Sequence, residues 1–361
     1  MGWGEVAART TTLPNTNQTE TPQMNILALS STNSGVGYHR IIMPLTYMMQ
    51  DKPNDSVLIT NIIDEETLSR KHWDVVVMNR SVAFPAERMV KLREKYGFKL
   101  IVDNDDHWVL DPHHNLADHY HQNKIGEQIV SYIEIADICT VTHERLAAEV
   151  YKHNKNVYIL PNGLPYGDGQ FMPHKHESDR VRLFWSGSDT HAQDISILRN
   201  PMNRVWSDFD LRCKVKTVMA GYSERSKPVW DVMASAFTQA LRFESTIYQM
   251  SMPDRYMAAY CDSDISVIPL LNTRFNSMKS NLKVLEAATK RNPVVVSMVD
   301  PYLDMPVCYV RTQQYWYKWI KELVNDAAMR EEKGNKLYEF CNKHFNINTI
   351  NQRRYEIYSR C

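Results

Sequence analysis

Short, wholly apolar segments that alternate with segments of helical periodicity constrain the fold of this chain most strongly. The first such unit begins at Met24, where an apolar strand is followed by a polar, glycine-bearing loop and a helix over 38–49. Strands that are apolar throughout are typical of a parallel sheet covered by helices on both faces. The first half of the chain therefore predicts a doubly wound α/β domain. Its strands are predicted over 26–30, 56–60, 73–78, 99–102, 137–141 and 157–160.

The same alternation begins again at Val181, after Pro161-Asn162-Gly163 and a stretch without periodicity that ends near Asp179. A chain of 361 residues exceeds what one hydrophobic core usually supports, so we expect two domains. The second set of strands is predicted over 181–185, 214–219, 246–248, 265–269 and 293–297. The predicted organisation is a flexible extension at 1–23, a first Rossmann-like domain at 24–165, a linker at 166–180, a second Rossmann-like domain at 181–338 and a C-terminal helix at 339–361.

Composition excludes several classes of protein. The 42 basic and 42 acidic residues balance, which argues against a protein that grips a polyanion by bulk charge, although a local basic patch stays open. No apolar window approaches the roughly 18 residues of a membrane helix, so we expect a cytoplasmic protein without membrane insertion. The six cysteines form no Cys-x-x-Cys pair, which disfavours a zinc knuckle or a disulfide framework.

A predicted helix over 279–289 carries the clearest chemistry. Lys279, Lys283 and Glu286 lie at positions i, i+4 and i+7, which would place them on one helical face. Two ammonium groups and the helix N-terminus near Asn281 would neutralise a diphosphate, and the carboxylate would accept ribose hydroxyls. The sequence thus predicts a nucleoside diphosphate site, and the alternative is a solvated helix face with ordinary Glu and Lys pairing.

This segment resembles the donor-binding signature of the large retaining group-one family of GT-B glycosyltransferases. Matching pieces are Tyr256-Met257-Ala258, Asp264-Ile265, Pro269, Leu285-Glu286-Ala287 and Pro293-Val294-Val295. The family usually has a second, sugar-associated glutamate eight positions before the equivalent of Glu286, where this chain has Met278. Sugar identity and stereochemical outcome therefore stay open. The loop Lys279-Ser280-Asn281-Leu282-Lys283 resembles a branch with small polar and basic residues there.

Two glycine loops extend the resemblance. Ser186–His191 is similar to the family's Gly-Ser-x-Thr-His loop, which implies donor contacts from Gly187, Ser188, Thr190 and His191. Lys216, on a predicted strand, is included among the donor-binding residues. In the first domain Ser34–Arg40 is similar to the N-terminal glycine loop, which implies donor contacts from Gly35, Gly37, Tyr38 and Arg40. It lacks the spacing of a dinucleotide fingerprint, and Tyr38 and Arg40 have the alternative of lying on a helix surface.

Acidic residues follow the predicted strand at 99–102. Asp105, Asp106 and His107 are the predicted catalytic or acceptor-side residues, with a metal-binding carboxylate pair and an Asx-type turn as alternatives. We disfavour the metal because Lys side chains and a helix terminus are predicted to contact the diphosphate. The nearby histidines match no zinc spacing, and we expect a mobile acceptor-side loop there. These histidines are His113, His114, His119 and His121.

The resemblance implies an α/β GT-B fold: two Rossmann-like domains face each other across a cleft, and the C-terminal helices pack back toward the first domain. It implies transfer of a sugar from a nucleotide-sugar co-substrate, UDP-sugar in preference to GDP-sugar, with no metal or other cofactor. In retaining members the leaving phosphate deprotonates the acceptor; an inverting enzyme would use Asp105, Asp106 or His107 as base.

Similarity to small bacteriophage glycosyltransferases makes hydroxymethylated DNA one predicted acceptor, in which case the enzyme would act in the host cytoplasm. Surface polysaccharide is the alternative acceptor. Rival functions are a GT-B sugar-nucleotide epimerase and a non-catalytic nucleotide-sugar-binding module. We expect a monomer or a homodimer.

Overall fold

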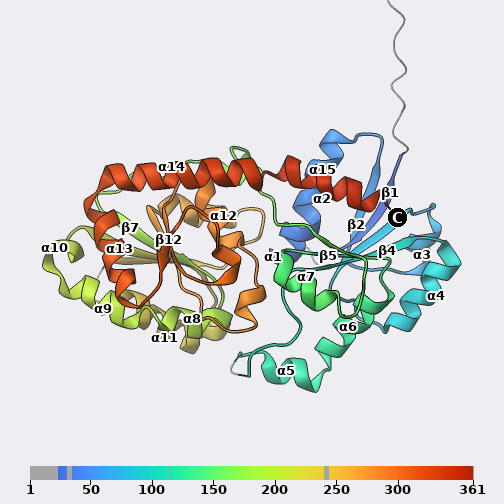
Figure 1. Ribbon diagram of the computed structural model, residues 1–361, viewed down its shortest axis with the longest axis horizontal. Coiled ribbons are helices and arrows are strands. Elements are labelled where there is room, and N and C mark those ends of the chain that lie inside the picture. Colours follow the sequence, from blue (N-terminus) through green and yellow to red (C-terminus); the bar gives the residue numbers. More distant parts are fainter. Residues whose placement is uncertain (1–22, 31–34, 113, 240–243, 361) are drawn as a thin grey trace, which may run out of the picture.

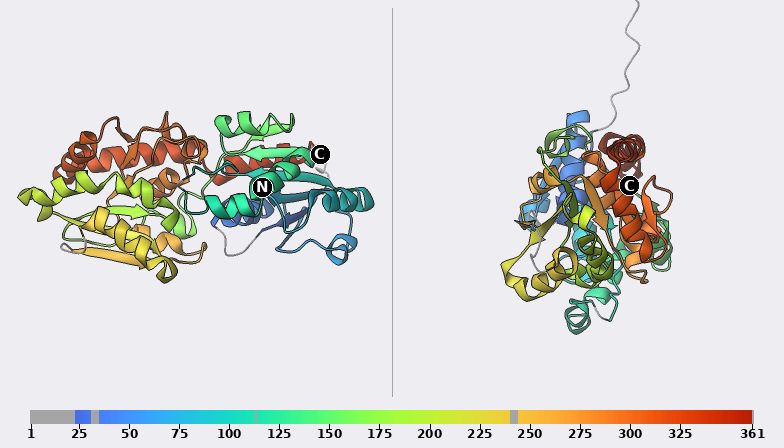
Figure 2. Two further views of the ribbon diagram at one scale, coloured as in Figure 1. Left: turned by 90° about the horizontal axis from the view of Figure 1, so that it is seen from below. Right: turned by 90° about the vertical axis from the view of Figure 1, so that its left-hand side faces the viewer.

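Two parallel six-stranded sheets, one in each half of the chain, form the core of the computed structural model (Figure 1). It describes residues 23–30, 35–112, 114–239 and 244–360. The two domains lie side by side along the long axis of the molecule (Figure 2). The predicted extension at 1–23 lies outside the described residues except for its last position.

The first domain has the strand order β2-β1-β3-β4-β5-β6, and all of its neighbouring strands are parallel. Its strands are β1 (Asn25–Leu29), β2 (Ser56–Thr60), β3 (Val75–Asn79), β4 (Lys99–Asn104), β5 (Ile138–Val141) and β6 (Val157–Ile159). Its helices are α1 (Gly35–Gly37), a π-helical turn (Tyr38–Ile42), α2 (Met43–Asp51), α3 (Glu65–Ser69), α4 (Ala86–Tyr96), α5 (Ala117–Gln122), α6 (Ile125–Ile135) and α7 (Glu144–Val150). The alternation of apolar strands with helices therefore gives the doubly wound domain that the sequence predicts.

The second domain has the strand order β12-β11-β10-β7-β8-β9, again parallel throughout. Its strands are β7 (Val181–Ser186), β8 (Val215–Tyr222), β9 (Ser245–Gln249), β10 (Ile265–Ile268), β11 (Val294–Ser297) and β12 (Cys308–Val310). Its helices are α8 (Ala192–Ser196), α9 (Arg199–Ser207), α10 (Phe209–Arg212), α11 (Lys227–Thr238), α12 (Leu282–Thr289), α13 (Gln314–Asn325) and α14 (Ala327–His344). The edge strand β12 is absent from the predicted set.

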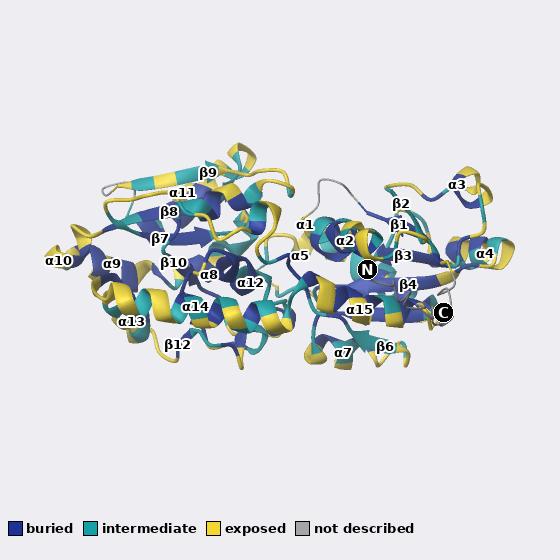
Figure 3. Ribbon diagram, turned by 90° about the horizontal axis from the view of Figure 1, so that it is seen from above, coloured by how far each residue is buried: buried dark blue, intermediate teal, exposed yellow. Residues whose placement is uncertain are grey.

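Apolar side chains on opposite faces of the central strands enter separate cores, which is why these strands are largely apolar. Figure 3 shows buried residues, in dark blue, along the central strands. Along β1, Leu27 and Leu29 pack into one cluster with α4 and α6. Ile26 and Ala28 pack into the other cluster with α2 and the last helix, α15 (Ile347–Tyr358). The C-terminal helix thus covers one face of the first sheet, as the sequence predicts.

The chain crosses between the domains twice. One crossing follows Leu164, and the other joins α14 to α15 across the top of Figure 1. The crossings pair with each other, because the Leu164 amide donates to the Phe345 carbonyl and the Ile347 amide donates to the Leu164 carbonyl. The boundary predicted between residues 338 and 339 falls inside the continuous helix α14. Within the described ranges, no helix is both long and apolar enough to cross a bilayer.

Candidate active site at the domain interface

Polar side chains from both domains meet where the carboxyl ends of their strands approach each other. Asp106, just beyond β4, contacts Lys279 of the second domain. His39, in the π-helical turn, lies within hydrogen-bond distance of the Tyr256 hydroxyl, 3.1 Å away. Carboxyl ends of parallel strands are where α/β folds bind ligands, so this interface is the candidate site.

Glu286 is the buried centre of the second-domain side of this interface. Its side chain projects from α12 and its carboxylate oxygens accept hydrogen bonds from the hydroxyls of Tyr256 and Tyr260, each at 2.6 Å. The Tyr260 hydroxyl also lies 2.7 Å from the Ser186 hydroxyl at the end of β7. Burial raises the pKa of Glu286, and the two tyrosine hydrogen bonds and the charge of Lys283 offset part of that rise.

Lys283, one turn before Glu286, presents a desolvated ammonium group to the loop after β7. Burial lowers the pKa of Lys283 to about 8, and the charge of Lys279 acts in the same direction while that of Asp194 opposes it. The ammonium lies 5.6 Å from the centre of the Trp185 ring. Among the described residues, no hydrogen bond and no carboxylate ion pair within 4.0 Å holds it. A half-buried cation in such a position is suited to an anionic ligand.

Gly187 makes room for this lysine. A β-carbon at this position would lie 2.8 Å from the Trp185 ring and 3.1 Å from the Lys283 Nζ. Gly221 on β8 packs against the other side, where a β-carbon would lie 2.1 Å from the Gly187 carbonyl oxygen. The loop is therefore held by close contacts that only glycines permit.

The rest of the loop is organised by Asp194 at the start of α8. One oxygen of Asp194 lies 2.8 Å from the His191 Nδ1, and the other accepts from the Leu271 amide and the Asn276 side chain. Burial and the charge of Lys283 lower the pKa of His191 to about 4, so its imidazole is neutral at pH 7. The hydroxyls of Ser188 and Thr190 lie 2.6 Å apart, so the polar groups predicted here cluster beside Lys283.

The acidic residues after β4 differ in their main contacts. Asp105 accepts from Arg80 at 3.2 Å, and Asp106 lies 3.3 Å from the Lys279 ammonium. Burial raises the pKa of Asp105, as do the charges of Asp106 and Asp103. Burial would also raise the pKa of Asp106, but Lys279 and Arg80 more than offset it and hold the pKa below its usual value. Asp106 is therefore the carboxylate that meets the second domain.

Comparisons with known proteins match at the level of fold. No family model and no curated protein sequence matches the chain. A sucrose-phosphate synthase from Thermosynechococcus elongatus aligns with a TM-score of 0.68 at 12% identity, over 94% of this chain and 99% of that one. HepE from Anabaena, solved with UDP and glucose, aligns with a TM-score of 0.66 at 11% identity, over 94% and 100%. An alpha-glucosyltransferase solved with UDP and a 13-mer DNA containing an HMU base aligns with a TM-score of 0.63 at 13% identity, over 94% and 100%.

The chain has the GT-B fold. The fold predicted from the donor-binding signature is thereby confirmed. Among the described residues, no group of three or more His, Cys, Asp or Glu side chains is arranged to hold a metal ion. Metal-independent chemistry stays a prediction.

The structure contradicts the predicted helical position of Lys279. The helix was predicted over 279–289, but α12 begins at Leu282, and Lys279 lies in extended backbone before it. Ser280 and Asn281 intervene, and such residues favour helix ends over helix interiors because their side chains compete for backbone hydrogen bonds. Lys279 consequently does not share a helical face with Lys283 and Glu286. It projects toward Asp106 and over the Phe275 ring.

Arg40 and His107 are corrected to structural roles. Arg40 is 1% exposed, donates to both oxygens of Asp103 at 3.0 and 2.7 Å, and also donates to Asn162. The guanidinium is enclosed within the protein and is not exposed to a ligand in this structure. His107 is 2% exposed and stacks on Trp108, with the ring centres 4.6 Å apart. It is turned into the first domain and is not placed to act as a base.

The structure also contradicts the donor contact predicted for Lys216. It is the second residue of β8 and pairs in register with Arg182 near the start of β7. Its ammonium lies 3.7 Å from Glu244 and 4.0 Å from Asp179. The candidate site lies at the opposite, carboxyl ends of these strands, so Lys216 is remote from it.

The N-terminal glycine loop is only partly described, because Ser34 lies outside the described residues. A β-carbon on Gly35 would meet no atom within 4 Å, so close packing does not explain this glycine. Gly37 is buried, and the π-helical turn that begins at Tyr38 brings His39 to Tyr256. The Tyr38 hydroxyl accepts from Gln170 of the linker at 3.0 Å. The donor contacts predicted for Gly35, Gly37 and Tyr38 stay predictions.

Met278 packs across the interface. It is 3% exposed and belongs to the apolar cluster of the first domain, although it follows β10 of the second. The position that the GT-B signature gives to a glutamate is therefore an apolar interdomain contact in this chain. Sequence reasoning missed Tyr260 and His39, which reach Glu286 and Tyr256 from distant segments. Tyr256 was noted only as part of a motif.

Proposed function

We propose that this protein is a glycosyltransferase that takes a sugar from a nucleoside diphosphate donor, UDP-sugar in preference to GDP-sugar. Lys283 carries the proposal, because a desolvated ammonium beside Gly187 has no carboxylate partner among the described residues. A diphosphate would supply the missing charge. UDP in particular is supported by the solved GT-B structures that contain it.

The chemistry uses the residues that flank this lysine. The bond between the sugar C1 and the diphosphate oxygen breaks, and a bond forms between C1 and the acceptor oxygen. Lys283 stabilises the negative charge that develops on the leaving diphosphate. Neutral His191 lies beside it, and Glu286 supplies the carboxylate predicted to bind ribose. No divalent ion is invoked, because ammonium groups perform this role.

The acceptor proton has two destinations. In a retaining reaction, which we favour from the sequence signature, it goes to the leaving phosphate. In an inverting reaction it goes to Asp106, the carboxylate that faces the second domain. The configuration of the product anomeric carbon, measured by NMR coupling constants, distinguishes these two mechanisms.

The sequence predicts two classes of acceptor. Hydroxymethylated bases in DNA, as for a bacteriophage enzyme, are supported by the similar alpha-glucosyltransferase structures that contain DNA. A carbohydrate acceptor is the second class, and the shape and charge of the first domain bear on the choice between them.

Calorimetric titration with UDP and GDP tests the proposal. We expect UDP to bind and Lys283→Gln to weaken it by about tenfold or more, as for loss of a charge-assisted contact. Lys227→Gln is the matched control, since Lys227 is exposed on α11 and pairs with Asp231. Absence of UDP and GDP binding by the folded chain would overturn the proposal. Release of free sugar and UDP without an acceptor would instead favour the epimerase class.

A further inference from the structure

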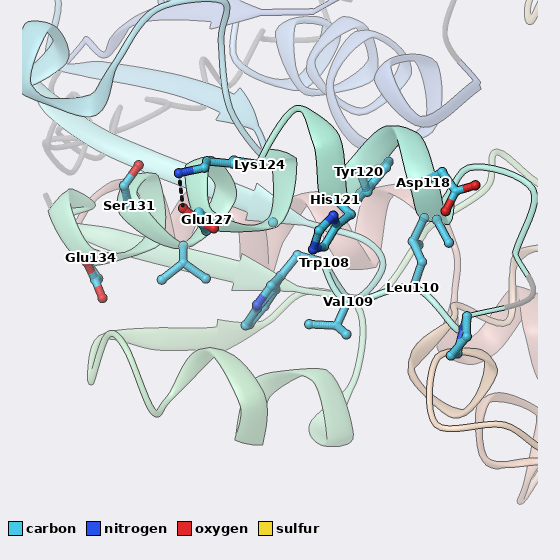
Figure 4. A pocket seen from close by; sticks show the side chains of 14 residues that line it. Trp108, Val109, Leu110, Asp118, Tyr120, His121, Lys124, Glu127, Ser131 and Glu134 are labelled. Carbon is cyan, nitrogen blue, oxygen red and sulfur yellow. Dashed lines mark ion pairs between the residues drawn. The ribbon is translucent and has the colours of Figure 1, made fainter.

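A groove on the first domain runs outward from the domain interface. Its volume is about 780 Å³, and it lies between the loop after Trp108 and the helices α5 and α6 (Figure 4). It is within the size range of small-molecule sites, about 300–1,000 Å³. Gly126 allows the loop to approach α6, because a β-carbon there would lie 3.1 Å from the Trp108 carbonyl oxygen.

The inner end of the groove lies beside the domain interface. Asp111, between the lining residues Leu110 and Pro112, accepts a hydrogen bond from Thr273 of the second domain. Arg80 connects the groove wall to the carboxylates after β4, since it donates to the Tyr120 hydroxyl at 2.8 Å and to Asp105 at 3.2 Å. A ligand in the groove would therefore extend from the neighbourhood of Asp105 and Asp106 to the outer surface.

The charges that line the groove disfavour a polyanion. Its carboxylates are Asp118, Glu127 and Glu134, against one ammonium group, Lys124, and the imidazole of His121. Lys124 lies 4.0 Å from Glu127, and both are exposed (Figure 4). His153 lies 3.4 Å from Glu134. Binding of nucleic acid depends on Lys and Arg side chains that neutralise phosphates, and this surface offers the opposite charge.

The same lining suits an uncharged, polyhydroxylated ligand. Tyr120 and His121 supply flat ring surface, on which the face of a sugar ring can pack, and Trp108, which is 7% exposed, borders it. The carboxylates and the Ser131 hydroxyl accept hydrogen bonds from ligand hydroxyls. Figure 4 shows His121 and Trp108 near the middle of this surface, with Ser131 and Glu134 toward its outer end.

We propose that this groove binds the acceptor, and that the acceptor is an uncharged oligosaccharide, not DNA. The inference rests on the proposed glycosyltransferase function and adds the substrate class and its location. The oligosaccharide lies along α6 and directs its terminal hydroxyl toward Asp106.

The test offers UDP-glucose, UDP-galactose and UDP-N-acetylglucosamine to the full chain together with two sets of acceptors. One set is a panel of neutral malto-, cello- and chito-oligosaccharides, and the other is duplex DNA containing hydroxymethylated bases. Transfer is followed by mass spectrometry. We expect sugar to be added to a neutral oligosaccharide and not to the duplex. Transfer to the duplex, or to no neutral oligosaccharide while UDP binds, would overturn the inference.

Two variants locate the site. Val130→Trp narrows the groove, and we expect the acceptor KM to rise about tenfold or more while the Kd for UDP stays within about twofold. The double variant Glu127→Gln with Glu134→Gln changes only exposed side chains, so it remains informative if Val130→Trp fails to fold; we expect its acceptor KM to rise about threefold. Val232→Trp, on the exposed surface of α11, is the matched control.

The outcomes separate the two proposals. An acceptor KM unchanged in both folded groove variants overturns the groove assignment while leaving the glycosyltransferase proposal intact. Loss of UDP binding in the unmodified chain overturns the proposed function, and the inference fails with it.

Discussion

The Asp106 carboxylate and the Lys279 ammonium lie 3.3 Å apart across the boundary between the two domains. Their side chains are 22% and 19% exposed, so water screens the pair only in part. Arg80 approaches the same carboxylate at 3.9 Å. If Lys279 binds the donor diphosphate as the sequence predicts, the phosphates must compete with Asp106 for it.

Asp106→Asn should therefore strengthen UDP binding. Removing the competing charge frees Lys279, and partly exposed ion pairs of this kind are worth about 0.2–1 kcal/mol, so we expect the Kd to fall by about 1.4-fold to fivefold. Calorimetry measures it. Asp231→Asn removes the exposed partner of Lys227 on α11 and should leave the Kd unchanged. A weaker or unaltered affinity in Asp106→Asn would argue that Lys279 does not contact the diphosphate.

Lys283 should contribute a rise in the free energy of unfolding with pH above 8. Its pKa is about 8 in the folded chain and near 10.5 when unfolded, so between these values the unfolded chain binds more protons. The free energy of unfolding then increases by at most about 1.4 kcal/mol per pH unit from this residue. Urea titrations between about pH 8 and 9 stay at least one unit below the ordinary pKa of tyrosine, about 10.

Lys283→Gln isolates this contribution. Lys175 also has a pKa lowered to about 8 by burial, and burial raises the pKa of Cys139 to about 12, so the unmodified chain contains slopes of both signs. The difference in slope between the unmodified chain and Lys283→Gln belongs to Lys283 alone. Equal slopes would mean that Lys283 is solvated, which would also weaken its proposed role with the diphosphate.

Gly187→Ala should be destabilising. The new methyl group would lie 2.8 Å from the Trp185 ring, which is packed in the core, and 3.1 Å from Lys283. Overpacking of this kind costs about 1–3 kcal/mol, and we expect UDP binding to weaken as Lys283 is displaced. Gly35→Ala provides the steric comparison, since its methyl group would meet no atom within 4 Å. Equal unfolding free energies for the two variants would contradict the packing of the loop.

Glu286→Ala should lower both stability and nucleotide affinity. The hydroxyls of Tyr256 and Tyr260 would lose their acceptor inside the protein, which costs about 1–3 kcal/mol. We expect the Kd for UDP to rise about tenfold or more if the carboxylate also binds ribose. The double variant Tyr256→Phe with Tyr260→Phe keeps the carboxylate and tests whether the tyrosines alone account for the loss. Unchanged UDP affinity in folded Glu286→Ala would refute the ribose role.

His107→Phe tests the correction made for this residue. A phenyl ring preserves the stack on Trp108, and the imidazole is too buried to reach a substrate. We expect kcat to stay within about twofold, whereas removal of a general base typically costs about a hundredfold or more. A loss of that size in a folded variant would restore His107 as a candidate base.

Local sequence patterns predicted the fold because the determining signals are close together in the chain. The segment 86–96 has helical periodicity in the sequence and forms α4, which ends at Gly97 in a left-handed conformation with φ of 74°. Strand β2 matches its predicted span as well. The three-residue strand β12 was missed, because so short a segment carries no periodicity.

The candidate site was harder to predict because its contacts join distant segments. Glu286 and Lys283 were identified from their spacing on one helix. Asp103 lies 63 positions from its partner Arg40. Tyr256 and Tyr260 lie 30 and 26 positions from their partner Glu286. No local sequence pattern indicates such pairings. Lys279 was placed on the helix by extending its periodicity backward by one turn. Ser280 and Asn281 were the signal that the helix begins later.

The paired crossings at Leu164 and Asn346 limit how the two domains can move. One connecting segment would allow a domain to rotate in any direction about it. Two connecting segments that lie side by side define one axis of rotation. The backbone hydrogen bonds between them hold that axis in place. Opening should therefore be a hinge rotation of one domain about this axis. Such a rotation would return Asp106 to Lys279 in the same alignment each time the domains close.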